Sequence, residues 1–302
     1  MKTKQEILNE RTVRLKKAIA LEKTDRTPVI LSADAFCANH MGVKLSDFCS
    51  TLKFSNEIML KSAKALGDFD GISNPIGSAQ LFPMIFAANV KMPGKELPDN
   101  ALWQLDEQEM MTREDYDTIL DKGWGSFFGD YLTNRLGISL GPLMEELAQM
   151  PQFNKNFEDE GYLVYCSVGS GTVNELLGGG RTLSRFIQDL YKIPDKVEAV
   201  LDVIQKETVD NLRQQIRATK PTVVFLSPAR GASEFFSQKL WNRFVWKYLK
   251  GTVDAIIEEG AAADIHIDGN WTRDLEQFNE FPKGKCIFET DGTIDIYKIK
   301  EV

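Results

Sequence analysis

Short strand-like runs alternate with helical patterns along this chain, and this alternation constrains the fold more than any other feature of the sequence. Six runs have the length and apolar content of strands, near residues 29–33, 70–74, 162–167, 222–227, 264–268 and 286–289. Helical patterns separate most of them; Pro194, for example, begins a pattern that runs to about Ala218. A strand followed by a helix, repeated along the chain, predicts a parallel sheet.

The residues at the strand ends distinguish two parallel architectures, an open doubly wound sheet and most of an eight-stranded barrel. Each run is followed by polar or small residues, namely Asp34, Asn74, Ser167, Ser227 with Arg230, Asp268 with Asn270, and Glu289 with Asp291. In a barrel all these ends converge on one mouth, whereas an open sheet uses only the ends beside its switch point. The pattern therefore favours a (β/α)8 barrel.

We expect a single barrel domain over residues 1–302, with an N-terminal helix over 4–22 and a long excursion over 76–160 between the second and third strands. Local signals predict further elements: loop and extended chain over 80–105, a helix from Thr112 as N-cap to about Gly123, and a helix over about 138–150 stopped by Pro151. The glycine run 178–180 is interpreted as part of a loop that precedes a helix from about Thr182. Gly169-Ser170-Gly171 lacks the third glycine of a dinucleotide fingerprint, so it is also interpreted as loop.

Composition excludes some classes of function. The net charge of -8 argues against nucleic-acid binding and against a membrane-surface role, since both favour a basic balance. The four cysteines have no C-x-x-C spacing, which indicates reduced thiols. The N-terminus has no signal-peptide core and no stretch reaches the roughly 18 apolar residues of a membrane span. We therefore expect a cytoplasmic protein.

The stretch from Asp264 to Trp271 is the best candidate for chemistry. It contains His266, one of two histidines in 302 residues. In a strand, Asp264, His266 and Asp268 share one face. If the strand is central, that face is buried and its polar groups need a metal, a substrate or paired partners. The alternative is an exposed edge strand with a polar outer face, and the stretch by itself leaves both open.

Several segments together make the chain resemble the uroporphyrinogen decarboxylase superfamily, and within it the cobalamin-dependent methyltransferase branch. They are Asp25-Arg26-Thr27-Pro28-Val29, Met92 to Pro98, Thr112 to Asp117, Asp189 to Val197, His266 to Trp271 and Glu289 to Thr293. Their order and spacing carry the resemblance over nearly the whole chain. It implies a (β/α)8 barrel of the uroporphyrinogen decarboxylase type with its active site at the carboxyl-end mouth.

Two departures from the family pattern affect the expected function. The loop over 32–40, which is arginine-rich in the decarboxylases, has no arginine here and contains Asp34. An octa-acid substrate needs cationic partners, so the decarboxylase interpretation is the weaker one. The resembling methyltransferases use zinc bound by a His-x-Cys pair and a later cysteine; here His266 matches the histidine and Asp268 stands at the first cysteine. The later cysteine would fall beyond Val302, and the last two strand–helix units are expected to be absent.

The sequence thus predicts a corrinoid-dependent methyltransferase component that moves a methyl group between a small methylated substrate or thiol and a corrinoid. The resemblance implies zinc as a cofactor, with His266 and Asp268 as its ligands, and a separate corrinoid protein as partner. A hydrogen-bonded His–Asp pair without metal is the alternative. Homo-oligomerisation is compatible with the sequence. The alternative functions are a uroporphyrinogen-type decarboxylase and an inactive or incomplete barrel that serves as a binding partner.

Six other residues complete the predicted site. Glu289 and Asp291 share a strand face and are expected to supply an acid or a further ligand, with a solvated strand end or a helix cap as the alternative. The predicted substrate-binding residues are Asn270, Trp271, Arg230 and Asp34. For Trp271 the alternative is packing at the barrel rim.

Overall fold

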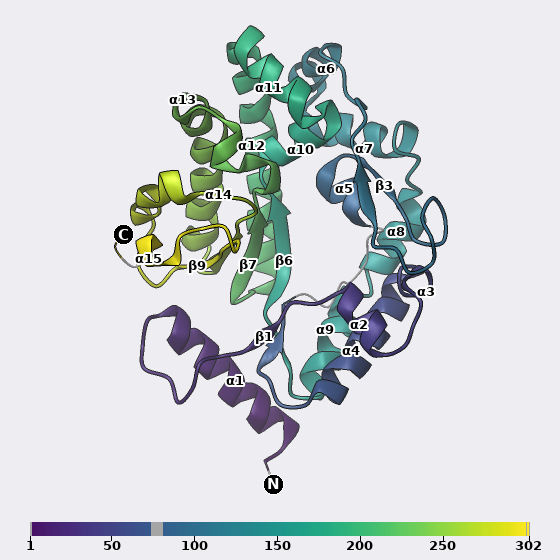
Figure 1. Ribbon diagram of the computed structural model, residues 1–302, viewed down its shortest axis with the longest axis vertical. Helices are drawn as coiled ribbons and strands as arrows, with labels where there is room; N and C mark the ends of the chain where they lie inside the picture. Colours follow the sequence, from purple (N-terminus) through teal and green to yellow (C-terminus); the bar gives the residue numbers. More distant parts are fainter. Residues whose placement is uncertain (1, 74–80, 300, 302) are drawn as a thin grey trace. The chain divides into compact units, whose positions relative to one another are not determined.

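The computed structural model describes residues 2–73, 81–299 and 301 (Figure 1). Contacts divide the chain into two compact units. The first comprises Met1–Met84, Asn89–Asp106 and Gly137–Ser167, and the second comprises Ile85–Ala88, Glu107–Leu136 and Val168–Val302. Each unit has its own hydrophobic core. The single domain predicted from the sequence stays a prediction, and Asn74 lies outside the described residues.

The described residues contain both parallel strands and one antiparallel pair. The strands are β1 Ile30–Leu31, β2 Gly71–Ile72, β3 Asn89–Lys91, β4 Gln104–Asp106, β5 Leu163–Val164, β6 Cys166–Gly171, β7 Val223–Ser227, β8 Ala262–His266 and β9 Cys286–Glu289. The helices of the first unit are α1 Lys4–Ile19, α2 Ala35–His40, α3 Leu45–Phe48, α4 Leu52–Leu66, α8 Leu140–Leu147 and α9 Met150–Asp159. Helix α5, Phe82–Phe86, crosses the boundary between the units.

The helices of the second unit are α6 Glu114–Lys122, α7 Trp124–Asn134, α10 Val173–Arg181, α11 Leu183–Lys192, α12 Pro194–Thr219, α13 Gln238–Trp241, α14 Lys247–Glu258 and α15 Ile296–Ile299. A π-helical turn, Asn242–Trp246, joins α13 to α14, and a 3-10 segment, Thr272–Glu280, precedes β9. Among the described residues, no helix combines the length and the hydropathy that crossing a membrane requires.

In the first unit, a parallel sheet in the order β1-β2-β5 places the first strands side by side. Gly71 is required here, because a Cβ at this position would lie 2.2 Å from the carbonyl oxygen of Leu163 on the neighbouring strand. The excursion after β2 contains the antiparallel pair β3–β4, where the sequence predicted only loop and extended chain.

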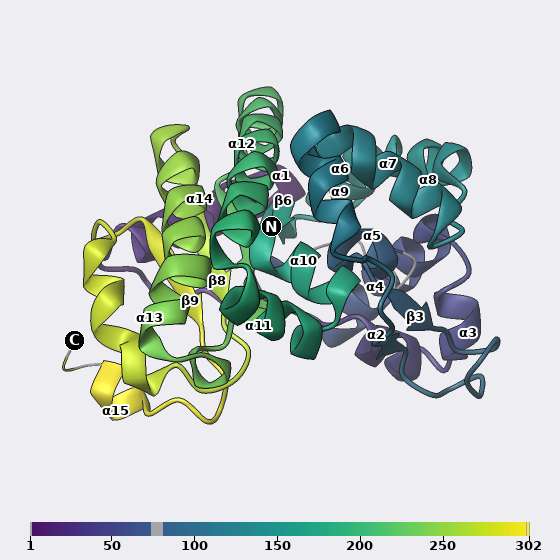
Figure 2. The ribbon, with the colours of Figure 1, turned by 90° about the horizontal axis from the view of Figure 1, so that it is seen from above.

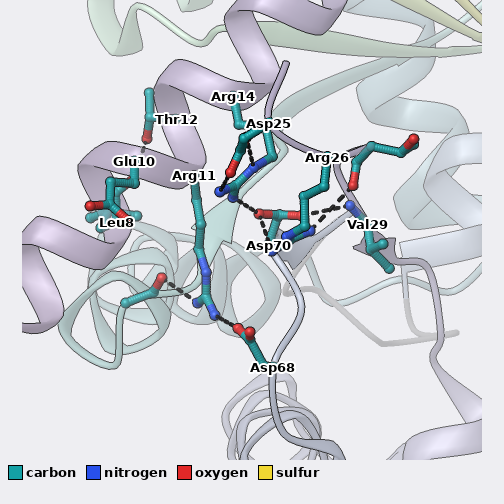
Figure 3. Close-up of polar contacts among 12 residues, drawn as sticks. Leu8, Glu10, Arg11, Thr12, Arg14, Asp25, Arg26, Val29, Asp68 and Asp70 are labelled. Carbon is teal, nitrogen blue, oxygen red and sulfur yellow. Dashed lines mark hydrogen bonds and ion pairs between the residues drawn. The ribbon is translucent and has the colours of Figure 1, made fainter. Parts of the chain in front are cut away.

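A buried carboxylate attaches the N-terminal helix to this sheet (Figure 3). Asp70, which is fully buried just before β2, accepts hydrogen bonds from Arg14 Nη1 of α1 at 2.5 Å and from Arg26 Nη1 at 2.6 Å. It also accepts the backbone N–H of Val29 at 2.7 Å. A buried charge is tolerated only when it is paired in this way, so Asp70 fixes the N-terminal segment against the start of β2.

In the second unit, four parallel strands follow one another in chain order, β6-β7-β8-β9. Strands β5 and β6 are separated only by Tyr165. The backbone N–H of Tyr165 donates a hydrogen bond to the carbonyl oxygen of Ile72 in β2, so the pairing with β2 continues through this residue. They therefore correspond to the single strand predicted near 162–167, and all six predicted strands are present. A doubly wound sheet would reverse its strand order at a switch point, whereas both sheets here keep chain order, as a barrel wall does. The parallel α/β class is confirmed.

The two faces of the second unit's sheet are packed differently. Helices α12 and α14 lie side by side (Figure 2) and α14 packs on β8. Val224, Leu226 and Ile265 are completely buried in this core. The opposite face carries Phe225, His266 and Glu289, which are only partly buried. This face is therefore the one with reachable polar groups.

One local prediction is wrong because Gly169-Ser170-Gly171 forms the end of β6 rather than a loop. Three others are wrong for identifiable reasons. The glycine run 178–180 lies inside α10 rather than in a loop, because α10 packs closely against neighbouring chain: a Cβ on Gly179 would lie 1.7 Å from the carbonyl oxygen of Phe86. Pro151 does not stop a helix; it occupies the first turn of α9, where its missing N–H costs nothing, and α8 ends at Leu147.

The third concerns the start of α6. Arg113, not Thr112, is its N-cap residue, although the backbone N–H of Thr112 does donate to Asp115 Oδ2 at 2.6 Å. The predicted end at Gly123 is confirmed by its φ of 83°.

Candidate functional site

His266 and Glu289 are paired across neighbouring strands at their carboxyl ends. The two residues are in register in the β8–β9 ladder. His266 Nδ1 lies 2.7 Å from Glu289 Oε2, and His266 Nε2 lies 3.4 Å from Asp268 Oδ1. Strand β8 lies between β7 and β9, so it is an interior strand and the edge-strand alternative is wrong.

The two carboxylates determine the charge of the imidazole. Hydrogen bonding to Asp268, and then to Glu289, raises the pKa of His266 to about 10, although burial opposes the shift. In the absence of metal, His266 is therefore a cation at neutral pH. His266 in turn lowers the pKa of Glu289, and a side-chain hydrogen bond with the fully buried Asp264 lowers it further. The acidic groups around His266 thus form one linked cluster.

The geometry of His266 and Asp268 fits part of a zinc site. With zinc–ligand bonds of about 2.0–2.1 Å and tetrahedral angles, two ligand atoms lie about 3.3–3.4 Å apart. The separation of His266 Nε2 and Asp268 Oδ1 is 3.4 Å. Glu289 on Nδ1 stands where an outer carboxylate orients a metal-ligating histidine. However, no group of three His, Cys, Asp or Glu side chains suited to a metal occurs among residues 2–73, 81–299 and 301. Two corners of a zinc site therefore fit, and a third ligand is not identified.

Arg230, which the sequence predicts to bind substrate, is held in ion pairs with Glu175 and Glu107, and its substrate contact stays a prediction. It follows β7 and forms an ion pair through Nη1 with Glu175, and its backbone N–H donates to Glu175 Oε2 at 2.6 Å. Burial raises the pKa of Glu175, and the charge of Arg230 partly offsets the effect. Glu175 was missed in the sequence. The available signal was a single carboxylate within the otherwise uncharged stretch 168–180.

Asn270 and Trp271 are engaged within the protein. Trp271 is fully buried in the hydrophobic core of the second unit and packs edge-to-face on Trp241 with ring centroids 5.2 Å apart. The side chain of Asn270 donates to Thr293 O at 3.1 Å and accepts from Thr272 N at 2.9 Å. Both residues therefore shape the loop after β8.

Asp291 forms a local turn rather than joining the imidazole. Its Oδ1 accepts the backbone N–H of Thr293 at 2.7 Å and the Thr293 hydroxyl at 2.6 Å. These bonds lower the pKa of Asp291. Of the predicted acidic pair, Glu289 alone contacts His266.

Asp34 belongs to the first unit and lies at the carboxyl end of β1. It precedes α2, but its side chain makes no capping hydrogen bond to that helix. Burial raises the pKa of its carboxyl to about 6. Asp34 can therefore gain or lose a proton near neutral pH.

Comparisons with known proteins agree with this fold. Residues 170–302 match the family model described as uroporphyrinogen decarboxylase (URO-D). Comparison with curated proteins gives no match. Among solved structures, a methyltransferase from Methanosarcina mazei is similar with a TM-score of 0.61 and 14% sequence identity, over 89% of this chain and 72% of that chain. At this identity the likeness shows the fold. The resemblance to the uroporphyrinogen decarboxylase superfamily is thus confirmed for residues 170–302, which contain the His266 cluster.

Proposed function

We propose that this chain is a methyltransferase component that moves a methyl group between a small methylated substrate or thiol and a corrinoid carried by a separate protein. The similar structure is a methyltransferase, which supports the reaction class. The observation that carries the proposal is the arrangement of His266, with Glu289 on one ring nitrogen and Asp268 beside the other. Corrinoid, zinc and the partner protein are parts of the proposal.

In this proposal His266 Nε2 and Asp268 Oδ1 would hold zinc, and Glu289 would keep the imidazole ring in the orientation that presents Nε2. Bound zinc supplies Lewis acidity, which favours the thiolate form of a thiol or polarises the heteroatom of a methyl ether or amine. Binding requires Nε2 to lose its proton, so metal and proton compete for this nitrogen. Glu289 continues to accept the hydrogen bond that Nδ1–H donates.

Charge at the carboxyl ends of β7, β8 and β9 argues against the alternative, decarboxylation of a uroporphyrinogen-type substrate. Such a substrate needs several cationic partners. Arg230 is already paired with Glu175, and His266 is flanked by two carboxylates. The loop over 32–40 has no arginine. A neutral or singly charged methylated compound is a better match.

The test uses the purified chain with added zinc in two assays: methylcobalamin with a panel of thiols as methyl acceptors, and cob(I)alamin with a panel of methyl ethers as methyl donors. We expect one zinc per chain and transfer of a methyl group from cobalt to a thiol, or from an ether to cobalt. Both should be lost in His266→Ala and retained in His40→Ala, which removes the other histidine and its contact with Ser62. Glu289→Gln should lower zinc affinity by about 10–100-fold, as changes at orienting residues do.

Three results would count against the proposal. They are a chain that binds no zinc and transfers no methyl group, an His266→Ala variant with wild-type transfer, and release of carbon dioxide from uroporphyrinogen. The last result would favour the decarboxylase.

A further inference from the structure

Asn270 joins the loops that follow three neighbouring strands. Its backbone N–H donates to Glu234 Oε1 at 3.2 Å, and its carbonyl oxygen accepts from Ser233 Oγ at 3.3 Å. Both partners lie in the loop after β7. Through its backbone, Asn270 therefore fixes the loop after β8 to the loop before it.

The side chain of Asn270 extends the connection to the third loop. Nδ2 donates to the carbonyl oxygen of Thr293, in the loop after β9, at 3.1 Å. Oδ1 accepts the backbone N–H of Thr272 within its own loop at 2.9 Å. Each of the four polar atoms of Asn270 thus has a protein partner. The substrate contact predicted from the sequence stays a prediction, because these bonds leave the second Nδ2–H and the second lone pair of Oδ1 unused.

Gly269, which lies between Asp268 and Asn270, links the position of Asp268 to the loops that Asn270 joins. Gly269 has φ of +79°, and a Cβ there would lie 2.7 Å from Glu234 Oε1 and 3.1 Å from Ala232 Cβ. Its backbone N–H also helps to lower the pKa of Asp291, two residues after Glu289. Because Asp268 precedes this tightly held glycine, its carboxylate moves with the loop that Asn270 holds.

We propose that Asn270 is a positioning residue that keeps the carboxylate of Asp268 beside Nε2 of His266 by joining the loops after β7, β8 and β9. The inference rests on the proposed function in one respect only, namely that the His266–Asp268 pair is the reactive site. The amide is required because it donates to Thr293 O and accepts from Thr272 N at once. An aspartate at this position can still accept the hydrogen bond from Thr272 N. Its second carboxylate oxygen, however, would face the carbonyl oxygen of Thr293 and would repel it.

The test compares Asn270→Asp with Asn134→Asp in the full chain without metal. Asn134→Asp is the matched control: it makes the same change of amide to carboxylate and also removes a side-chain N–H donation, at an exposed position on α7. The readout is the low-field imidazole N–H proton and ring-nitrogen NMR signals of His266. With only two histidines in the chain, they are assigned by comparison with His40→Gln.

We expect Asn270→Asp to shift the Nε2 signals of His266 by more than their line width, and Asn134→Asp to leave them in place. Ser233→Ala, which removes a single bond to Asn270, should shift them less and in the same direction. If Asn270→Asp does not fold, the shift of the His266 signals in Ser233→Ala tests the proposal instead. Unchanged His266 signals in the folded variants would overturn the proposal and leave Asn270 with a structural role only. Failure of methyl transfer in the wild-type chain would count against the proposed function and would not alter this readout.

Discussion

His266 Nδ1 lies 2.7 Å from Glu289 Oε2, and this contact connects the last two strands of the second unit at their carboxyl ends. Together with Asp268 on Nε2, it makes protonation of the imidazole favourable in the folded chain. The pKa of His266 is about 10, compared with the ordinary value of 6.5. Chain stability must therefore depend on the protonation state of this residue.

The first prediction concerns pH and the metal-free protein. Since the folded pKa of His266 is raised, its contribution to stability is fully present below pH 6.5 and is lost as pH rises through about 10. The free energy of unfolding should fall more between pH 7 and pH 10 for the wild-type chain than for His266→Gln, as measured by urea denaturation. His40→Gln should keep the wild-type dependence. Parallel curves for wild type and His266→Gln would contradict the shift.

The second prediction concerns the buried carboxylate of the first unit. Asp70→Asn leaves Arg14 and Arg26 without their buried charge partner, so it should destabilise the chain by about 3–5 kcal/mol, as loss of one partner of a buried pair does. Asp68→Asn provides the control, because Asp68 is 83% exposed in its pair with Arg11 and should cost about 1 kcal/mol or less. Equal losses in urea denaturation would show that burial does not distinguish the two pairs.

The pH dependence of this pair has the opposite sign. Burial alone would raise the pKa of Asp70, but the Val29 amide and the guanidinium groups of Arg26 and Arg14 lower it overall. Its stabilisation is therefore present above pH 3.8 and is lost as the pH falls through the lowered pKa. Asp70→Asn should remove that acid-dependent loss.

The third prediction tests why glycines occupy α10. Gly179→Ala places a methyl group 1.7 Å from the carbonyl oxygen of Phe86, so backbone must move, and we expect destabilisation of about 3 kcal/mol or more. Gly178→Ala meets side chains and no backbone, namely Arg230 at 3.2 Å from Cδ and Phe186 at 3.9 Å from Cδ1. It gains helix propensity of about 1 kcal/mol, so it should cost less than Gly179→Ala. Thermal unfolding of both variants measures the difference. A tolerated alanine at position 179 would contradict the close packing of α10.

The fourth prediction concerns Asp34. Burial raises its pKa from 3.8 to about 6, so the folded chain binds a proton more tightly than the unfolded chain, and stability falls as pH rises through that interval. Asp34→Asn should therefore stabilise the chain at pH 7, by at most roughly 3 kcal/mol, and should have little effect below pH 3.8. Carboxyl NMR titration of the wild-type chain measures the pKa directly. An ordinary value near 3.8 would contradict the prediction.

The sequence by itself determined the six parallel strands, the long helix from Pro194 and the resemblance to the family. Short apolar runs and helix signals located all six strands of the parallel sheets and the long helix from Pro194, because these patterns depend on neighbours along the chain. The alternation of side chains in a strand also placed Asp264 and His266 on one face. These features are local, so no knowledge of distant contacts was needed.

Tertiary structure decided which of the candidate residues have partners. The pairing of Arg230 with Glu175 and the burial of Trp271 depend on elements far apart in the sequence that pack together. The helical state of residues 178–180 has the same origin, since packing against Phe86 overrides the low helix propensity of glycine. Parallel register brought Glu289 to His266. A polar residue at a strand end can face a ligand or another side chain, and only the three-dimensional arrangement, through distance and burial, determines which of the two it meets.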